Sequence, residues 1–194
     1  HKEYRRQRQM CIRDRDTRVS VKKYLLGTSK QFGGGAAIFW QIDLLGRIRT
    51  GKIMQYDPAT GKRIKYAINW AHCFMNIEKP PQCFFGEHLL ADTRKPIAIV
   101  ESEKTAMIAN AYLPEFTWMA AGAKQGLTEE KCRVLKGRKV TLFPDLGAFD
   151  DWRDKAERFK SIADFQVSDY LERMATPEEK EQGLDIADFL HIPF

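Results

Sequence analysis

Residues 96–112 read PIAIVESEKTAMIANAY, and the spacing of their apolar positions indicates the fold class. Pro96–Val100 is a short apolar run that ends at Glu101. Apolar residues then recur at helical spacing from Glu103 to Tyr112, and Ser102 precedes them as the expected N-cap. This pattern predicts a buried strand that leads into a helix, with an acidic residue at the junction.

The same alternation of strands and helices continues to the end of the chain. Further strands are expected at residues 116–121, 139–143 and 165–171. The segments between them predict a helix at 128–135 capped by Thr128, a helix at 150–162, and a closing turn or short helix at 185–190. Strand and helix alternation of this kind predicts an α/β domain over residues 96–194, with a mostly parallel sheet flanked by helices.

The part of the chain before residue 96 follows a different pattern. Residues 36–70 alternate apolar and polar positions, with turn-forming breaks at 43–46 and 57–61. Period-two alternation with such breaks predicts an antiparallel meander. We therefore expect a small β-rich lobe over residues 16–95.

Composition excludes several classes of protein. The chain has 194 residues, of which 43% are hydrophobic and 30% charged, as in ordinary globular proteins. No stretch approaches the roughly 18 apolar residues of a membrane span, so no membrane partner is expected. The four cysteines are spaced too irregularly for a zinc knuckle or a disulfide framework. These features favour a reducing, cytoplasmic location.

The first 15 residues carry much of the basic charge. They hold six Lys or Arg against two acidic residues, which gives +4 of the net +6. Residues 10–15, MCIRDR, also match a translation of the transposon end used in sequencing-library adapters. We expect residues 1–15 to be a non-native or disordered segment, with the native chain beginning further upstream. The alternative is a natural basic arm with affinity for phosphate.

Acidic residues follow two of the expected parallel strands. Glu101 and Asp145 lie just beyond their carboxyl ends, where functional groups gather in open parallel sheets. Asp185 and Asp188 follow the fourth strand. Carboxylates that converge in one crevice repel one another, so they stay ionised at neutral pH only when a cation such as Mg²⁺ neutralises them. The sequence therefore predicts a Mg²⁺ site, which Mn²⁺ would also fit.

Two of these segments resemble the motifs of the Toprim domain shared by primases, topoisomerases and related nucleases. Residues 97–112, IAIVESEKTAMIANAY, resemble its first motif, in which a strand ends in a Glu that opens a helix. Residues 139–152, KVTLFPDLGAFDDW, resemble its second motif, a strand that ends in an acidic D-x-D turn. The resemblance implies a Toprim-like sheet in which Glu101 and Asp145 are catalytic.

The order of the segments is similar to that of a bacterial primase core. Residues 35–57, GAAIFWQIDLLGRIRTGKIMQYD, resemble its amino-terminal subdomain, residues 82–96 resemble the segment just before the Toprim Glu, and residues 183–190, GLDIADFL, resemble its late acidic element. Most of residues 25–194 is also similar to uncharacterised primase-like proteins of Bacteroidetes and their mobile elements. Fuller members of this layout have a zinc-binding module upstream.

The resemblance implies Mg²⁺ held by Glu101, Asp145, Asp185 and Asp188. It implies single-stranded DNA or an RNA–DNA hybrid as the macromolecular ligand, and nucleoside triphosphates as substrates if the chain is active. A helicase or a replication initiator is the expected protein partner. The implied activity is that of a primase-type nucleotidyltransferase in replication or mobilisation of DNA.

The second motif departs from the family pattern, because Gly147 stands where the second Asp is expected, and Ser102 replaces a usual Gly in the first motif. Loss of a group that binds or orients a metal commonly costs 10- to 100-fold in affinity or activity. One interpretation is that Asp150 or Asp151 supplies the missing carboxylate. The other, which we favour, is that both only stabilise the positive end of the helix dipole. Three functions therefore stay open: a primase-type enzyme, a catalytically degenerate binding module and a Toprim nuclease.

Basic residues gather on the meander, interleaved with Trp40, Tyr56 and Tyr66. Such a face suits a single-strand path that uses phosphate contacts and base stacking, and the resemblance places the template groove there. A solvated strand face is the alternative. The basic residues are Arg47, Arg49, Lys52, Lys62, Arg63 and Lys65.

Overall fold

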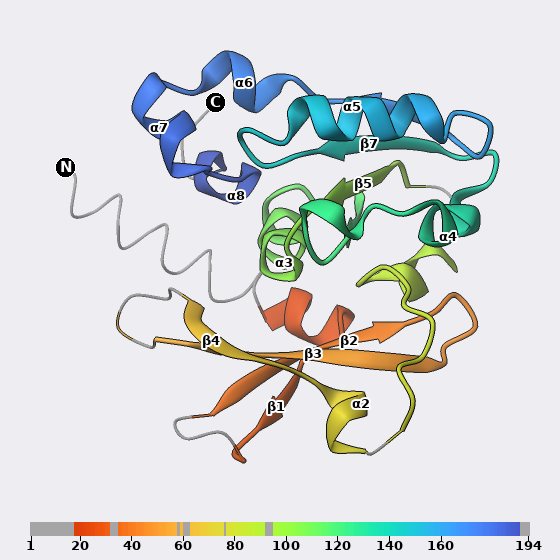
Figure 1. Ribbon diagram of the computed structural model, residues 1–194, viewed down its shortest axis with the longest axis vertical. Coiled ribbons are helices and arrows are strands. Elements are labelled where there is room, and N and C mark those ends of the chain that lie inside the picture. The colour runs from red at the N-terminus through yellow and green to blue at the C-terminus, as the bar shows by residue number, and fades with distance from the viewer. Residues whose placement is uncertain are drawn as a thin grey trace. The chain divides into compact units, whose positions relative to one another are not determined.

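The computed structural model describes residues 18–31, 35–57, 59, 63–75, 77–91 and 95–190. The expectations for residues 1–15 and for Lys62 fall outside these ranges. The chain divides into two compact units (Figure 1). Val21–Ala91 form the first, called the β unit below, and Asp92–Phe194 belong to the second, called the α/β unit.

The β unit is built on a four-stranded antiparallel sheet in the order β1-β2-β3-β4. The predicted meander over residues 36–70 is confirmed. The sequence did not predict β1, which is only three residues long and begins with a glycine. The strands are β1 (Gly27–Ser29), β2 (Ala36–Ile42), β3 (Ile48–Tyr56) and β4 (Arg63–Trp70).

Aromatic side chains form the core of the β unit. The Phe39 ring meets the Phe85 ring edge-on at 5.7 Å between centroids, and Phe85 stacks on Tyr24 at 5.0 Å. All three are at most 3% exposed. Phe39 is buried in β2, whereas Ile38 and Trp40, which point to the opposite face, are only half-buried. The short helix α2 (Ala71–Phe74) and the 3₁₀ helix η1 (Glu87–Ala91) complete the unit.

The α/β unit contains a four-stranded sheet in which every neighbouring pair is parallel, in the order β6-β5-β7-β8. This confirms the predicted mostly parallel sheet. Every residue of β5 and β6 is buried, as expected for a sheet covered on both faces. The strands are β5 (Ile97–Val100), β6 (Thr117–Ala120), β7 (Lys139–Phe143) and β8 (Asp164–Val167).

Helices join these strands. In Figure 1, α5 (Phe149–Arg158) lies above β7 and α3 (Glu103–Tyr112) lies below β5. The predicted cap of α3 is confirmed, because Ser102 Oγ accepts a hydrogen bond from Thr105 N at 3.4 Å. The predicted helix at 128–135 is split into α4 (Glu129–Cys132) and the 3₁₀ helix η3 (Arg133–Leu135). The 3₁₀ helix η2 (Lys124–Gly126) lies in the loop after β6.

The end of the chain differs from the prediction. The fourth strand was expected to continue to residue 171 but ends at Val167, and Leu171 is buried in the helix α6 (Tyr170–Met174). The third helix was expected to reach residue 162 but ends at Arg158. The helices α7 (Pro177–Gln182) and α8 (Ile186–Phe189) then follow.

No helix within the described ranges is long and apolar enough to cross a lipid bilayer.

Candidate metal and nucleotide site

Glu101 and Asp145 meet at the carboxyl edge of the parallel sheet. Val100 and Phe143 are opposite each other in the pairing of β5 with β7, and the two acidic residues follow within two positions. Glu101 Oε1 accepts a hydrogen bond from the backbone N–H of Asp145 at 3.4 Å. Adjacent parallel strands thus bring the first two predicted site residues together, as the topology of open sheets implies.

Helix α8 brings the other two predicted carboxylates to the same edge. Asp185 caps this helix, and Asp188 completes a capping box by accepting the N–H of Asp185 at 3.0 Å. The Thr105 hydroxyl, on α3, donates to Asp185 Oδ2 at 2.6 Å. Since α3 begins just after Glu101, this bond fixes α8 beside the strand end that carries Glu101.

The four carboxylates influence one another electrostatically. Burial is the main cause that raises the pKa of Asp145 to about 8, and the negative charges of Glu101, Asp185 and Asp188 supply the rest of the rise. Burial is also the main cause of the raised pKa values of Glu101 and Asp185. Without a counter-charge, at least one of these groups is therefore protonated near neutral pH.

The four carboxylates form no closed cage for a divalent cation. Among the residues that the structure describes, no group of three or more His, Cys, Asp or Glu is arranged to hold a metal ion. Mg²⁺, however, usually binds through one or two carboxylates and keeps several waters. Asp145 Oδ1 is buried and has no hydrogen-bond partner within the described ranges. This oxygen is the acceptor that a hydrated cation would satisfy.

Lysine side chains hold the loop after β6 next to these carboxylates. Lys155 Nζ, from α5, donates to the Lys124 carbonyl at 2.9 Å and to Gln125 Oε1 at 3.0 Å. Trp152 Nε1 donates to the same carbonyl at 3.1 Å. Lys124 and Lys155 are both close enough to Glu101 to lower the pKa of its carboxyl, against the larger effect of burial.

The sequence analysis missed these lysines. The rule that located Glu101 and Asp145, which examines the residues just beyond each parallel strand, also applies to the loop after β6. Applied there, it would have drawn attention to Lys124.

Gly147, at the position of the missing second Asp, adopts a left-handed backbone with φ of 80°. A Cβ at this position would meet no atom within 4 Å. The Gly147 N–H donates to Glu172 Oε1 at 3.3 Å, and its carbonyl accepts from Lys124 Nζ at 3.2 Å. Two charged side chains, Glu172 and Lys124, therefore hold the backbone of the turn at Gly147.

Asp150 and Asp151 lie in the first turn of α5, where the helix dipole favours negative charge. Neither is a capping residue, because the N-cap of α5 is Ala148 and it makes no side-chain cap bond. Asp150 pairs with Arg153 at 2.9 Å. Asp151 pairs with Lys124 at 3.2 Å and thereby belongs to the surroundings of the site.

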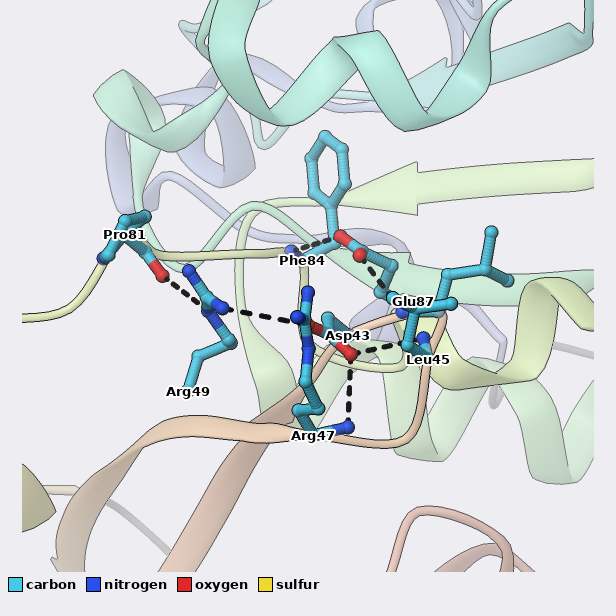
Figure 2. Close-up of polar contacts among 8 residues, drawn as sticks. Asp43, Leu45, Arg47, Arg49, Pro81, Phe84 and Glu87 are labelled. Carbon is cyan, nitrogen blue, oxygen red and sulfur yellow. Dashed lines mark hydrogen bonds and ion pairs between the residues drawn. The ribbon is translucent and has the colours of Figure 1, made fainter.

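In the β unit, two of the three arginines of the predicted basic cluster, Arg47 and Arg49, have structural partners (Figure 2). Arg47 Nε donates to Asp43 Oδ2 at 2.8 Å, and Arg49 Nη1 lies 3.7 Å from the same oxygen. Arg49 Nε also donates to the Pro81 carbonyl at 3.2 Å. The Arg47 side chain is nevertheless 61% exposed and that of Arg49 is 26% exposed.

Figure 2 also shows how the β2–β3 turn is anchored. Asp43 Oδ1 accepts the N–H groups of Leu45 and Arg47, both at 3.0 Å. Glu87, which is 5% exposed, accepts the N–H groups of Leu44 and Phe84, both at 3.2 Å. The turn that carries Arg47 is therefore rigidly attached to the segment that follows β4.

The remaining members of the basic cluster differ in exposure. Arg63 is exposed, whereas Lys52 is buried with 8% of its surface exposed, so Lys52 is a poor candidate for a phosphate contact. Lys62 and the side chain of Lys65 lie outside the described part of the chain. The Trp40 indole lies across Gly27 and Gly51, where a Cβ would come within 2.6 Å of the ring.

Comparison with solved structures identifies the fold. The primase fragment of the bacteriophage T7 primase-helicase protein is similar at 14% identity with a TM-score of 0.50, over 85% of this chain and 68% of that chain. A chain of a bacteriophage T7 complex, in which the lagging-strand DNA polymerase interacts with primase domains bound to an RNA/DNA hybrid and dTTP, is similar at 15% identity with a TM-score of 0.51, over 89% and 84% of the two chains. The fold is therefore that of a primase domain.

The family assignment follows from the sequence match. Residues 7–146 match the model of the family described as Domain of unknown function (DUF6371), and the chain belongs to this family. No curated protein matches the chain.

Proposed function

We propose that this protein is a primase-like Toprim protein that acts on single-stranded DNA or an RNA–DNA hybrid during replication or mobilisation of DNA. The proposed activity is Mg²⁺-dependent nucleotidyl transfer, with Mn²⁺ as an alternative ion. The observation that carries this proposal is the meeting of Glu101 and Asp145 at the ends of adjacent parallel strands, with the buried Asp145 Oδ1 lacking a hydrogen-bond partner within the described ranges.

The residues have distinct roles in the proposal. Glu101 and Asp145 would hold the cation, and Asp185 and Asp188 would add negative charge from α8. Thr105 fixes Asp185 by the 2.6 Å hydrogen bond. When bound, the cation would neutralise the phosphate oxygens of a nucleoside triphosphate and favour attack by a hydroxyl.

The β unit supplies the proposed contact with the strand. Arg47 and Arg63 are exposed basic residues and Arg49 is partly exposed, which suits contacts with a phosphate backbone. A helicase or a replication initiator is the proposed protein partner. The similarity to a fragment of a primase-helicase protein supports the first of these.

Primer synthesis tests the enzymatic proposal. The protein is incubated with single-stranded DNA, nucleoside triphosphates and Mg²⁺, and labelled products are separated by length. We expect short products that a chelator abolishes and that Glu101→Gln lowers by about 100-fold or more, because the principal cation ligand is lost. Lys160→Met, an exposed change two residues beyond the end of α5, is the control and should leave synthesis unchanged.

A catalytically degenerate binding module is the second candidate, and Gly147 is the observation that favours it. In that case the wild type makes no product at any Mg²⁺ or Mn²⁺ concentration, while single-strand affinity persists and Glu101→Gln leaves it intact. Mg²⁺-dependent cleavage of the DNA in the same assay would instead identify a Toprim nuclease. Absence of both products and binding at low ionic strength contradicts the whole proposal.

A further inference from the structure

Lys124 places an ammonium group where the acidic turn lacks its second carboxylate. Its Nζ donates to the Gly147 carbonyl at 3.2 Å and pairs with Asp151 Oδ2 at 3.2 Å. Gln125 Nε2 donates to the same Asp151 oxygen at 3.4 Å. The two acceptors on this side of the site are thus already occupied by a positive charge.

Two side chains of α5 hold the backbone of Lys124. Its carbonyl accepts hydrogen bonds from Lys155 Nζ and from Trp152 Nε1, at 2.9 Å and 3.1 Å. Lys155 and Trp152 are both buried. The backbone of Lys124 is therefore attached to α5, and its ammonium contacts both the turn between β7 and α5 and the first turn of α5.

Four carboxylates at one edge of a sheet have enough charge for two divalent cations, as in sites where paired ions clamp a reacting phosphate. Here a second ion would have to bind beside Gly147 and Asp151. It would displace Lys124 or share its two oxygen ligands with it, and repulsion between the like charges opposes both.

We propose that Lys124 acts as the second cation of this site, so that the site takes one divalent ion per chain. The inference rests on the proposed function, since it assumes that the carboxylates of Glu101 and Asp145 bind an ion. In this arrangement Glu101 and Asp145 would hold the single ion, and the Lys124 ammonium contacts the Gly147 carbonyl and Asp151. One phosphate group of a polyphosphate would then contact the ion, and another would contact Lys124.

Mn²⁺ binding to the whole protein tests the inference without any measurement of activity. Free Mn²⁺ is followed by electron paramagnetic resonance as protein is titrated, which gives both stoichiometry and affinity. We expect one Mn²⁺ per chain in the wild type. Lys124→Met should bind that ion about three- to tenfold more tightly, because a nearby positive charge is removed. Lys160→Met removes a lysine charge elsewhere in the unit and should match the wild type.

A double variant tests the replacement itself. Gly147→Asp alone should still bind one ion, because the new carboxylate pairs with Lys124. Lys124→Met combined with Gly147→Asp should bind two. Asp is among the residues that tolerate a left-handed backbone, and the space around Gly147 is open, so we expect the variants to fold, with circular dichroism as the check.

The outcomes separate the inference from the proposed function. Two ions in the wild type, a Lys124→Met affinity equal to that of Lys160→Met, or one ion in the double variant would each overturn the role of Lys124 and leave the proposed function standing. Absence of Mn²⁺ binding by the wild type would overturn both. If the wild type binds one Mn²⁺ and Glu101→Gln binds none, the result supports the cation site on which the inference rests.

Discussion

At the scale of single residues, Asp145 combines a buried oxygen that lacks a partner within the described ranges with three neighbouring carboxylates. Its pKa of about 8 in the folded protein is far above the 3.8 of an ordinary Asp. A carboxyl whose pKa is raised by folding binds more protons in the folded state than in the unfolded state. Its contribution to stability is therefore fully present below about pH 4 and is lost as the pH rises to about 8.

Without divalent cations, we expect the melting temperature to fall as the pH is raised from about 5 to about 8. Asp145→Asn keeps the shape of the protonated side chain and removes the charge, so it should flatten this dependence. At about pH 8 it should melt several degrees above the wild type. Some slope should remain, because folding also raises the pKa of Glu101 and Asp185.

Mg²⁺ provides the control for this experiment. It should raise the melting temperature of the wild type at high pH and have little effect on Asp145→Asn, since the variant lacks the anionic ligand. A wild-type melting temperature that increases over the same pH range in the presence of a chelator would contradict the assignment of Asp145 as the protonated group.

At the scale of secondary-structure elements, the attachment of α8 to α3 depends on the Thr105 hydroxyl. Thr105 is 2% exposed, and its bond to Asp185 Oδ2 joins two helices that are 80 positions apart in sequence. Thr105→Val keeps the shape and removes the bond, so we expect a loss of about 1–2 kcal/mol in the free energy of unfolding. Hydrogen exchange of residues 184–190 should become faster, as measured by mass spectrometry.

Thr176→Val is the matched control. Thr176 also uses its hydroxyl within a capping box, but it caps only α7, which has no buried residues. This variant should accelerate exchange in α7 and leave residues 184–190 unchanged. If both variants affect α8 equally, the Thr105 bond is not what holds it.

The strands and caps were predictable where a local pattern was sufficient. Ser102 and Thr128 cap their helices as expected because each is followed by helix-forming residues and supplies a hydroxyl to its own first turn. Leu171 was misplaced because a single apolar residue after a strand pattern fits either a longer strand or the buried face of a new helix. Only packing distinguishes the two.

The candidate site was predictable in its acidic half. Glu101 and Asp145 follow apolar runs, and topology alone brings such positions together. The basic half depends on contacts between side chains and carbonyls, which leave no periodic pattern in the sequence. Lys52 is buried because β3 is covered on both faces from Thr50 to Met54, and a period-two pattern does not show that a strand is covered on both faces.

At the scale of the whole molecule, the proposed contact with nucleic acid predicts a dependence on salt. Affinity for a single-stranded oligonucleotide should fall as salt is raised, since phosphate contacts release counterions. Arg63→Gln should weaken binding and reduce the slope of log affinity against log salt by about 0.7. Lys160→Gln, an equally exposed basic position in the α/β unit, should change neither quantity. Fluorescence anisotropy measures both, and affinity that is independent of salt would contradict the contact.

The attachment of the β2–β3 turn to Glu87 bears on the order in which the β unit folds. The Asp43 bonds join residues at most four positions apart and can form as soon as the hairpin does, within about 1–10 μs. Glu87 is 43 positions from Leu44, so its bond must wait for the closure of a long loop. During folding, the hairpin therefore forms with its local ion pair before the segment that carries Glu87 docks on it. Until that long loop closes, the turn is not attached to the segment that follows β4.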